Sequence, residues 1–145
     1  MGRLIGIART HELKAPMEEI ACAHVSVENG IAGDARGRKL GRQVTVLFRE
    51  GWEDACRDVG VDLPWTTRRA NLYVEGLDPP QKAGGKLAIG GMLLEITKET
   101  APCEFMERSQ TGLRAAMTPE WRGGVCCRVL SGGEIALGDA VTLSA

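Results

Sequence analysis

Short apolar runs separated by glycine-rich turns extend along most of the chain. Many short strands joined by such turns favour a mainly β fold with a few short helices, its sheet either closed into a barrel or folded into a sandwich. The runs with the length and composition of β-strands are residues 3–9, 20–27, 43–48, 71–75, 92–99, 125–130, 134–137 and 140–143.

Two segments have the spacing of helices instead. In 49–59, Trp52, Ala55 and Cys56 recur on one helical face, which predicts that Trp52 packs into the core. Residues 104–117 are also helix-like and are predicted to break near 110–112.

Glycine pairs mark two further turns. The run 86–97 is apolar and β-forming, with Gly90-Gly91 at its middle, which indicates a turn or bulge. The ending 131–141 predicts a hairpin followed by a turn into a last strand.

Cys103 is the residue with the clearest chemical potential. It follows Pro102 at the end of a strand-like run and precedes a helix-like segment, so we expect its thiol to be held outside the core. Free amides and the dipole at a helix start favour a thiolate, which can ligate a metal or carry sulfur. The alternative is a buried cysteine that packs as a small hydrophobic residue.

Length and charge limit the classes of partner. The 145 residues fit a single domain, 1–145, and 18 basic against 19 acidic residues give a net charge of −1. No basic run is interleaved with aromatics, so we expect neither nucleic acid nor an anionic membrane as a partner. An anionic ligand would have to be bound by local arginines.

The chain starts with strand-like alternation rather than a signal peptide, and it has no apolar stretch of the roughly 20 residues that cross a bilayer. We therefore expect a cytoplasmic protein whose five cysteines are thiols. The neighbours Cys126 and Cys127 point to opposite sides of a strand and are interpreted as packing residues.

Polar residues follow two turns in the first half of the chain. The glycine-rich segment 29–38 presents Asp34 and Arg36, where the backbone can approach a ligand; the alternative is a surface loop. Arg42 opens the next strand, as an anion contact or as a solvated strand end.

A third polar group surrounds the start of the strand near Ala70. If the strand begins there, Arg69 and Asn71 lie on one face and Arg68 points elsewhere. A guanidinium beside an amide suits a phosphate or a heterocycle edge. A salt-bridged arginine and a turn-capping asparagine are the alternative.

Taken in order, these clusters resemble the MOSC domain, named after the C-terminal part of molybdenum cofactor sulfurase, in its short stand-alone bacterial form. The resemblance runs from about residue 27 to residue 141. It is carried by Gly30-Ile31-Ala32-Gly33-Asp34, Arg42-Gln43-Val44, Arg69-Ala70-Asn71-Leu72 with Gly76, Leu87-Ala88-Ile89-Gly90, Pro102-Cys103, Gly112-Leu113-Arg114, and Arg122-Gly123-Gly124-Val125 leading to Gly132-Gly133 and Gly138-Asp139.

The resemblance implies a β-barrel-like fold in which Cys103 binds the molybdenum of a pterin cofactor or carries sulfur. It also implies that Arg69 and Asn71 contact the pterin or phosphate end of the cofactor. The sulfurase relatives carry a separate pyridoxal-phosphate domain, for which this chain has no room, so no pyridoxal phosphate is expected. The chain departs from the family at Ala35-Arg36-Gly37, where many relatives have a histidine, and at Thr100, where short forms often have a second cysteine.

Three functional hypotheses follow. In the first, the domain binds the molybdenum-pterin cofactor through Cys103 and reduces small N-hydroxylated substrates with electrons from a donor protein, with Glu104 and Asp34 as candidate proton donors. In the second, it is a non-enzymatic carrier of persulfide sulfur or of cofactor, with a cysteine desulfurase as partner. In the third, its role is structural only. The sequence is compatible with a monomer or a homodimer.

Overall fold

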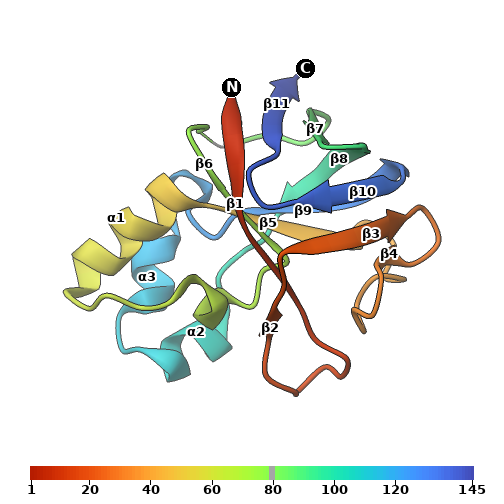
Figure 1. Cartoon of the computed structure of the whole chain (residues 1–145). Helices are drawn as coiled ribbons and strands as arrows, with labels where there is room; N and C mark the ends of the chain where they lie inside the picture. Colours follow the sequence, from red (N-terminus) through yellow and green to blue (C-terminus); the bar gives the residue numbers. More distant parts are fainter. Residues whose placement is uncertain (79–80) are drawn as a thin grey trace.

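Seven strands form a closed barrel in the computed structural model, which describes residues 1–78 and 81–145 (Figure 1). Strand β1 closes the barrel because it pairs with β6 on one side and with β11 on the other, with Gly2 opposite Val141. Neighbouring strands are antiparallel except β5 and β6, which are parallel. In sheet order the strands are β11 (Ala140–Ser144), β7 (Lys86–Ile89), β8 (Met92–Glu99), β9 (Val125–Ser131), β5 (Val44–Phe48), β6 (Leu72–Glu75) and β1 (Gly2–Arg9), with β2 (Glu18–Glu19) beyond β1.

A smaller sheet covers one side of the barrel. It consists of β10 (Gly133–Ala136), β3 (Cys22–Ser26) and β4 (Gly30–Ile31). Val25, Ile31 and Ile135 from this sheet are buried in the same core cluster as the side chains inside the barrel.

The strand patterns explain which faces are covered. Strand β8 alternates, with Met92, Leu94 and Ile96 buried in the barrel core. All five residues of β5 are buried, because this strand has the barrel on one face and helices on the other. Phe48 belongs to the barrel core and Leu47 to a second core under the helices.

The helical layer lies opposite the smaller sheet in Figure 1. It comprises α1 (Arg49–Val59), α2 (Glu104–Ser109), α3 (Leu113–Met117) and the 3-10 turns η1 (Trp65–Arg68) and η2 (Pro119–Trp121). Its core contains Trp52, Met106 and Leu113, which confirms the prediction for Trp52. Within the described ranges, no helix has the length and hydropathy that crossing a membrane requires.

The barrel confirms the mainly β prediction and excludes the sandwich alternative. Helix α1 spans the predicted 49–59, and the segment 104–117 breaks between α2 and α3 as expected. Gly90-Gly91 forms the turn of the β7–β8 hairpin. The two-residue strands β2 and β4 were not predicted.

The predicted hairpin within 131–141 is wrong. Strand β10 pairs with β3 in the smaller sheet instead of pairing with a neighbour along the chain. The turn before it packs against other backbone: a Cβ at Gly132 would clash with the carbonyl oxygen of Val25, and one at Gly133 with that of Gly91. These contacts direct the chain out of the barrel and onto β3.

Candidate functional site

Cys103 lies at the start of α2 and is exposed, as predicted. Its backbone is extended, with φ −130°, and its carbonyl oxygen accepts a hydrogen bond from the Met106 amide at 2.9 Å. The chain leaves β8 at Glu99 and passes Pro102 before the helix begins, so the thiol stays outside both cores. The alternative of a buried packing cysteine is therefore excluded for Cys103.

The Cys103 side chain lines a cavity of about 510 Å³ that we call the arginine pocket. Five arginines and one lysine line it, and no carboxylate is among the lining side chains of the described residues. Such a concentration of positive charge suits an anionic ligand. The cationic residues are Lys14, Arg36, Arg42, Arg68, Arg69 and Arg108.

Arg68 is the most buried of these cations, with 7% of its surface exposed. Its guanidinium donates to backbone carbonyl oxygens, through Nε to Gly123 at 3.1 Å and through Nη2 to Thr100 at 2.7 Å. Burial lowers its pKa to about 10. A buried cation held only by neutral carbonyls gains electrostatic stabilisation when an anion binds next to it.

The pairing predicted for Arg69 and Asn71 does not occur, because β6 starts only at Leu72. Arg69 ends the turn η1 in a left-handed conformation, φ 62°, so the two-residue period of a strand does not apply there. Arg68, expected to point elsewhere, lines the pocket together with Arg69. The Arg69 Nη2 group donates to the Ala15 carbonyl at 2.8 Å.

Asn71 is buried in the sheet, with 1% of its surface exposed, and is not among the residues that line the pocket. Its Nδ2 donates to the Ala8 carbonyl at 3.1 Å, and its Oδ1 accepts from the Thr45 amide at 3.1 Å. Asn71 therefore joins β1, β5 and β6 where the barrel changes from antiparallel to parallel pairing.

Asp34 and Arg36 come together in the glycine-rich segment. The Asp34 carboxylate is buried, accepts from the Thr10 amide at 3.0 Å and pairs with Arg36 at 3.4 Å. Arg36 Nη1 donates to the Arg69 carbonyl at 2.7 Å, whereas its Nε is buried without a hydrogen-bond partner among the described residues. Arg36 lines the pocket, and its ion pair with Asp34 helps to fix its position there.

The remaining candidates are divided between the pocket and other places. Arg42 lies in the pocket wall. The Glu104 carboxylate pairs with Arg114 at 3.4 Å and is outside the lining. Thr100 lines the pocket, and its hydroxyl lies 3.3 Å from the sulfur of the buried Cys126.

Sequence reasoning missed Lys14, Arg68 and Arg108. Lys14 comes from an irregular segment and Arg108 from a short helix, and neither carries a local pattern. Gly123 was a usable signal for Arg68: a Cβ there would clash with the Thr100 carbonyl and approach Arg68 Nη2 to 3.2 Å.

The MOSC domain family profile matches residues 26–142. Among solved structures, the chain is similar to the YuaD protein of Bacillus subtilis, with 19% identity, a TM-score of 0.79 and coverage of 99% of this chain and 96% of that one. YiiM of Geobacillus stearothermophilus has 16% identity and a TM-score of 0.77, covering 100% and 76%. YiiM of Escherichia coli has 16% identity and a TM-score of 0.71, covering 99% and 70%. A search of curated protein sequences gave no match.

Proposed function

This chain belongs to the MOSC domain family of molybdenum cofactor-related domains, and we propose that its arginine pocket binds a molybdenum-pterin cofactor with the Cys103 thiolate as a metal ligand. One observation carries the proposal: Cys103 shares a cavity with the buried Arg68, whose charge has no carboxylate partner among the hydrogen bonds of the described residues. A phosphorylated ligand would supply the missing negative charge.

The donor set fits both ends of such a cofactor. Guanidinium groups bind phosphate through paired donors, and a thiolate is a ligand for a soft metal. The buried Nε of Arg36 is a further unused donor beside the pocket. The volume of about 510 Å³ lies in the usual range for cofactor and ligand sites, roughly 300 to 1,000 Å³.

In this function, the part of the protein is to hold the cofactor and to orient it. The carbonyls of Gly123 and Thr100 fix the Arg68 guanidinium before any ligand arrives, so its donors need no reorganisation. Asp34 fixes Arg36 in the same way. When bound, the cofactor would supply the redox chemistry, reduction of the N–O bond of a small N-hydroxylated substrate with electrons from a donor protein. The exposure of Cys103 leaves this end of the pocket open to a substrate.

That same exposure favours a second candidate, a carrier that holds persulfide sulfur on Cys103 after delivery by a cysteine desulfurase. A carrier must present its sulfur to an acceptor, which a thiol at the surface can do. The two functions differ in what Cys103 bonds to, molybdenum or a terminal sulfur.

The test is elemental analysis for molybdenum, with pterin fluorescence after oxidative release, on protein made in a host that synthesises the cofactor. We expect stoichiometric metal and pterin in the wild type and loss of the metal in Cys103→Ser. Cys22→Ser is the matched control, because Cys22 is also exposed but lies outside the pocket. Wild-type protein without metal or pterin contradicts the proposal, and cyanide-labile sulfur on Cys103 then supports the carrier.

A second pair of variants tests the anion-binding wall. Arg68→Gln removes the buried cation, and we expect at least about a tenfold loss of pterin affinity, since charged hydrogen bonds are worth about 1.5–3 kcal/mol. Arg128→Gln is the control, because Arg128 is paired with Glu95 away from the pocket. Equal pterin content in both variants would exclude Arg68 from binding.

A further inference from the structure

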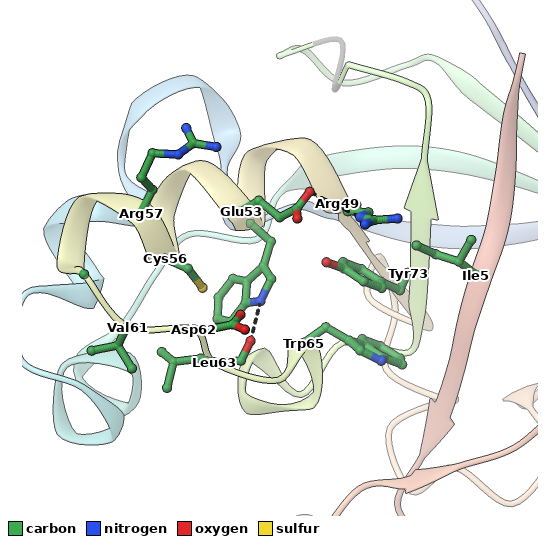
Figure 2. A pocket seen from close by; sticks show the side chains of 12 residues that line it. Ile5, Arg49, Glu53, Cys56, Arg57, Val61, Asp62, Leu63, Trp65 and Tyr73 are labelled. Atoms are coloured by element: carbon green, nitrogen blue, oxygen red, sulfur yellow. Dashed lines mark hydrogen bonds and ion pairs between the residues drawn. The ribbon is translucent and has the colours of Figure 1, made fainter.

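A second cavity, the aromatic pocket, lies between α1 and the strands β1 and β6 (Figure 2). Its volume is about 630 Å³, within the range of small-molecule sites. Trp52 from α1 lines it, together with the stacked pair of Trp65 from η1 and Tyr73 from β6. The two stacked rings lie 5.1 Å apart and are nearly parallel, at 2°.

These aromatic walls are fixed in place. The Trp52 indole nitrogen donates to the Leu63 carbonyl at 3.2 Å, and that of Trp65 donates to the Glu19 carboxylate at 3.1 Å. Trp52 is also part of the core of the helical layer. The pocket is therefore preformed, and a ligand would not have to order its walls.

The two arginines at the rim are already neutralised by neighbouring carboxylates. Arg49 donates to Glu75 at 2.8 Å and to Glu53 at 3.2 Å. Arg57 donates to Asp54 at 2.7 Å. Each guanidinium therefore already has a carboxylate partner, which reduces its attraction for an anionic ligand.

One carboxylate of the lining stays without a counter-ion among the described residues. Asp62 lines the pocket and takes part in none of the ion pairs found among residues 1–78 and 81–145. Burial raises the pKa of the Cys56 thiol, and Asp62 and Glu53 raise it further. Burial also raises the pKa of Tyr73 to about 12; Glu53 adds to this effect and Arg49 opposes it. Carboxylates thus act on groups at both walls of the pocket.

We propose that the aromatic pocket binds a small organic cation, an amine or guanidinium attached to an apolar group. The half-buried ring systems of Trp65 and Tyr73 attract a cation and cover an apolar body, and the buried Trp52 closes the pocket on the core side. The carboxylate of Asp62 lies where it can pair with its charge. This preference is opposite to that of the arginine pocket, so the two cavities select ligands of different charge.

The short turn η1 separates the two sites. Trp65 at its first position lines the aromatic pocket, and Arg68 at its last position lines the arginine pocket. A ligand in the aromatic pocket therefore touches a segment that also positions the buried guanidinium.

The experiment is a titration of ¹⁵N-labelled protein at neutral pH with phenethylamine as the probe, followed through the three tryptophan indole N–H resonances. We expect saturable shifts for Trp52 and Trp65 and none for Trp121, which does not line the pocket. Phenethyl alcohol, the neutral analogue, should bind about tenfold more weakly because it loses both the cation–π and the carboxylate attraction. The anion 3-phenylpropionate should bind more weakly still.

Asp62→Asn should weaken binding of phenethylamine about threefold. Glu53→Gln is a second variant, because it removes another negative charge from the lining of the pocket. Asp58→Asn is the matched control, since Asp58 lies on the same helix but outside the lining and pairs with Arg122, which is also outside it. Unchanged backbone spectra establish that each variant is folded. The proposal is overturned by an absence of saturable shifts, by equal affinity for the neutral analogue, or by equal effects of Asp58→Asn and Asp62→Asn.

Discussion

The barrel and the helical layer each enclose an apolar core, but they use it differently. The barrel core is built from alternating strand side chains such as Leu72 and Leu94, and it is closed by β1. In the helical layer, Trp52 also lines the aromatic pocket and Met106 also lines the arginine pocket. The larger core thus supplies stability, whereas residues of the smaller core also form part of the walls of both cavities.

The largest expected effect tests the barrel side of this comparison. Leu94→Ala removes a fully buried side chain, and we expect the free energy of unfolding to fall by about 3 kcal/mol. Urea denaturation measures this. Phenethylamine binding by the folded fraction should stay unchanged, because Leu94 does not touch the helical layer's core. A loss of unfolding free energy below about 1 kcal/mol, or altered phenethylamine binding, would contradict the division of roles between the barrel core and the core of the helical layer.

Asn71→Ala tests whether this residue acts as part of the barrel or of the site. It leaves the Thr45 amide and the Ala8 carbonyl without their side-chain partner, so we expect a loss of about 2 kcal/mol. The pterin content of the folded protein should equal that of the wild type. Retained stability together with lost pterin would instead favour the cofactor contact implied by the resemblance.

The smallest effect concerns Tyr73, which is the only tyrosine in the chain, so its ionisation can be followed by ultraviolet absorbance. We expect a pKa of about 12, lowered by Glu53→Gln, because Glu53 is among its causes after burial. The folded value lies above the unfolded value of about 10, so the stabilisation from the neutral side chain is complete below pH 10 and is lost as the pH rises through about 12. A pKa that is the same in the wild type and in Glu53→Gln would contradict the influence of the carboxylates inferred for the aromatic pocket.

The sequence predicted the barrel strands and α1 because their signals are local. Alternation in β8 and the 3.6-residue spacing in α1 are each visible within one element. Strands β2 and β4 have two residues each, too few for any period.

The site was only partly predictable. Cys103, Arg42 and Arg36 follow from turns next to recognisable elements, and all line the pocket. Arg68 was missed, because the left-handed backbone at Arg69 breaks the period on which the expectation rested. Asn71 was expected in the site but lies outside it. Its side-chain donor and acceptor are hydrogen-bonded within the sheet, so they are not available to a ligand.

The pairing of β1 with β11 has a consequence for synthesis of the protein. A ribosome releases β1 early, but its partner at residues 140–144 comes 131 residues after the end of β1 at Arg9. Until then β7 and β1 each have a free edge, and free edges pair with other chains. The nascent chain therefore stays exposed to aggregation until β11 emerges, and premature termination just before that point leaves an open sheet rather than a slightly shortened barrel.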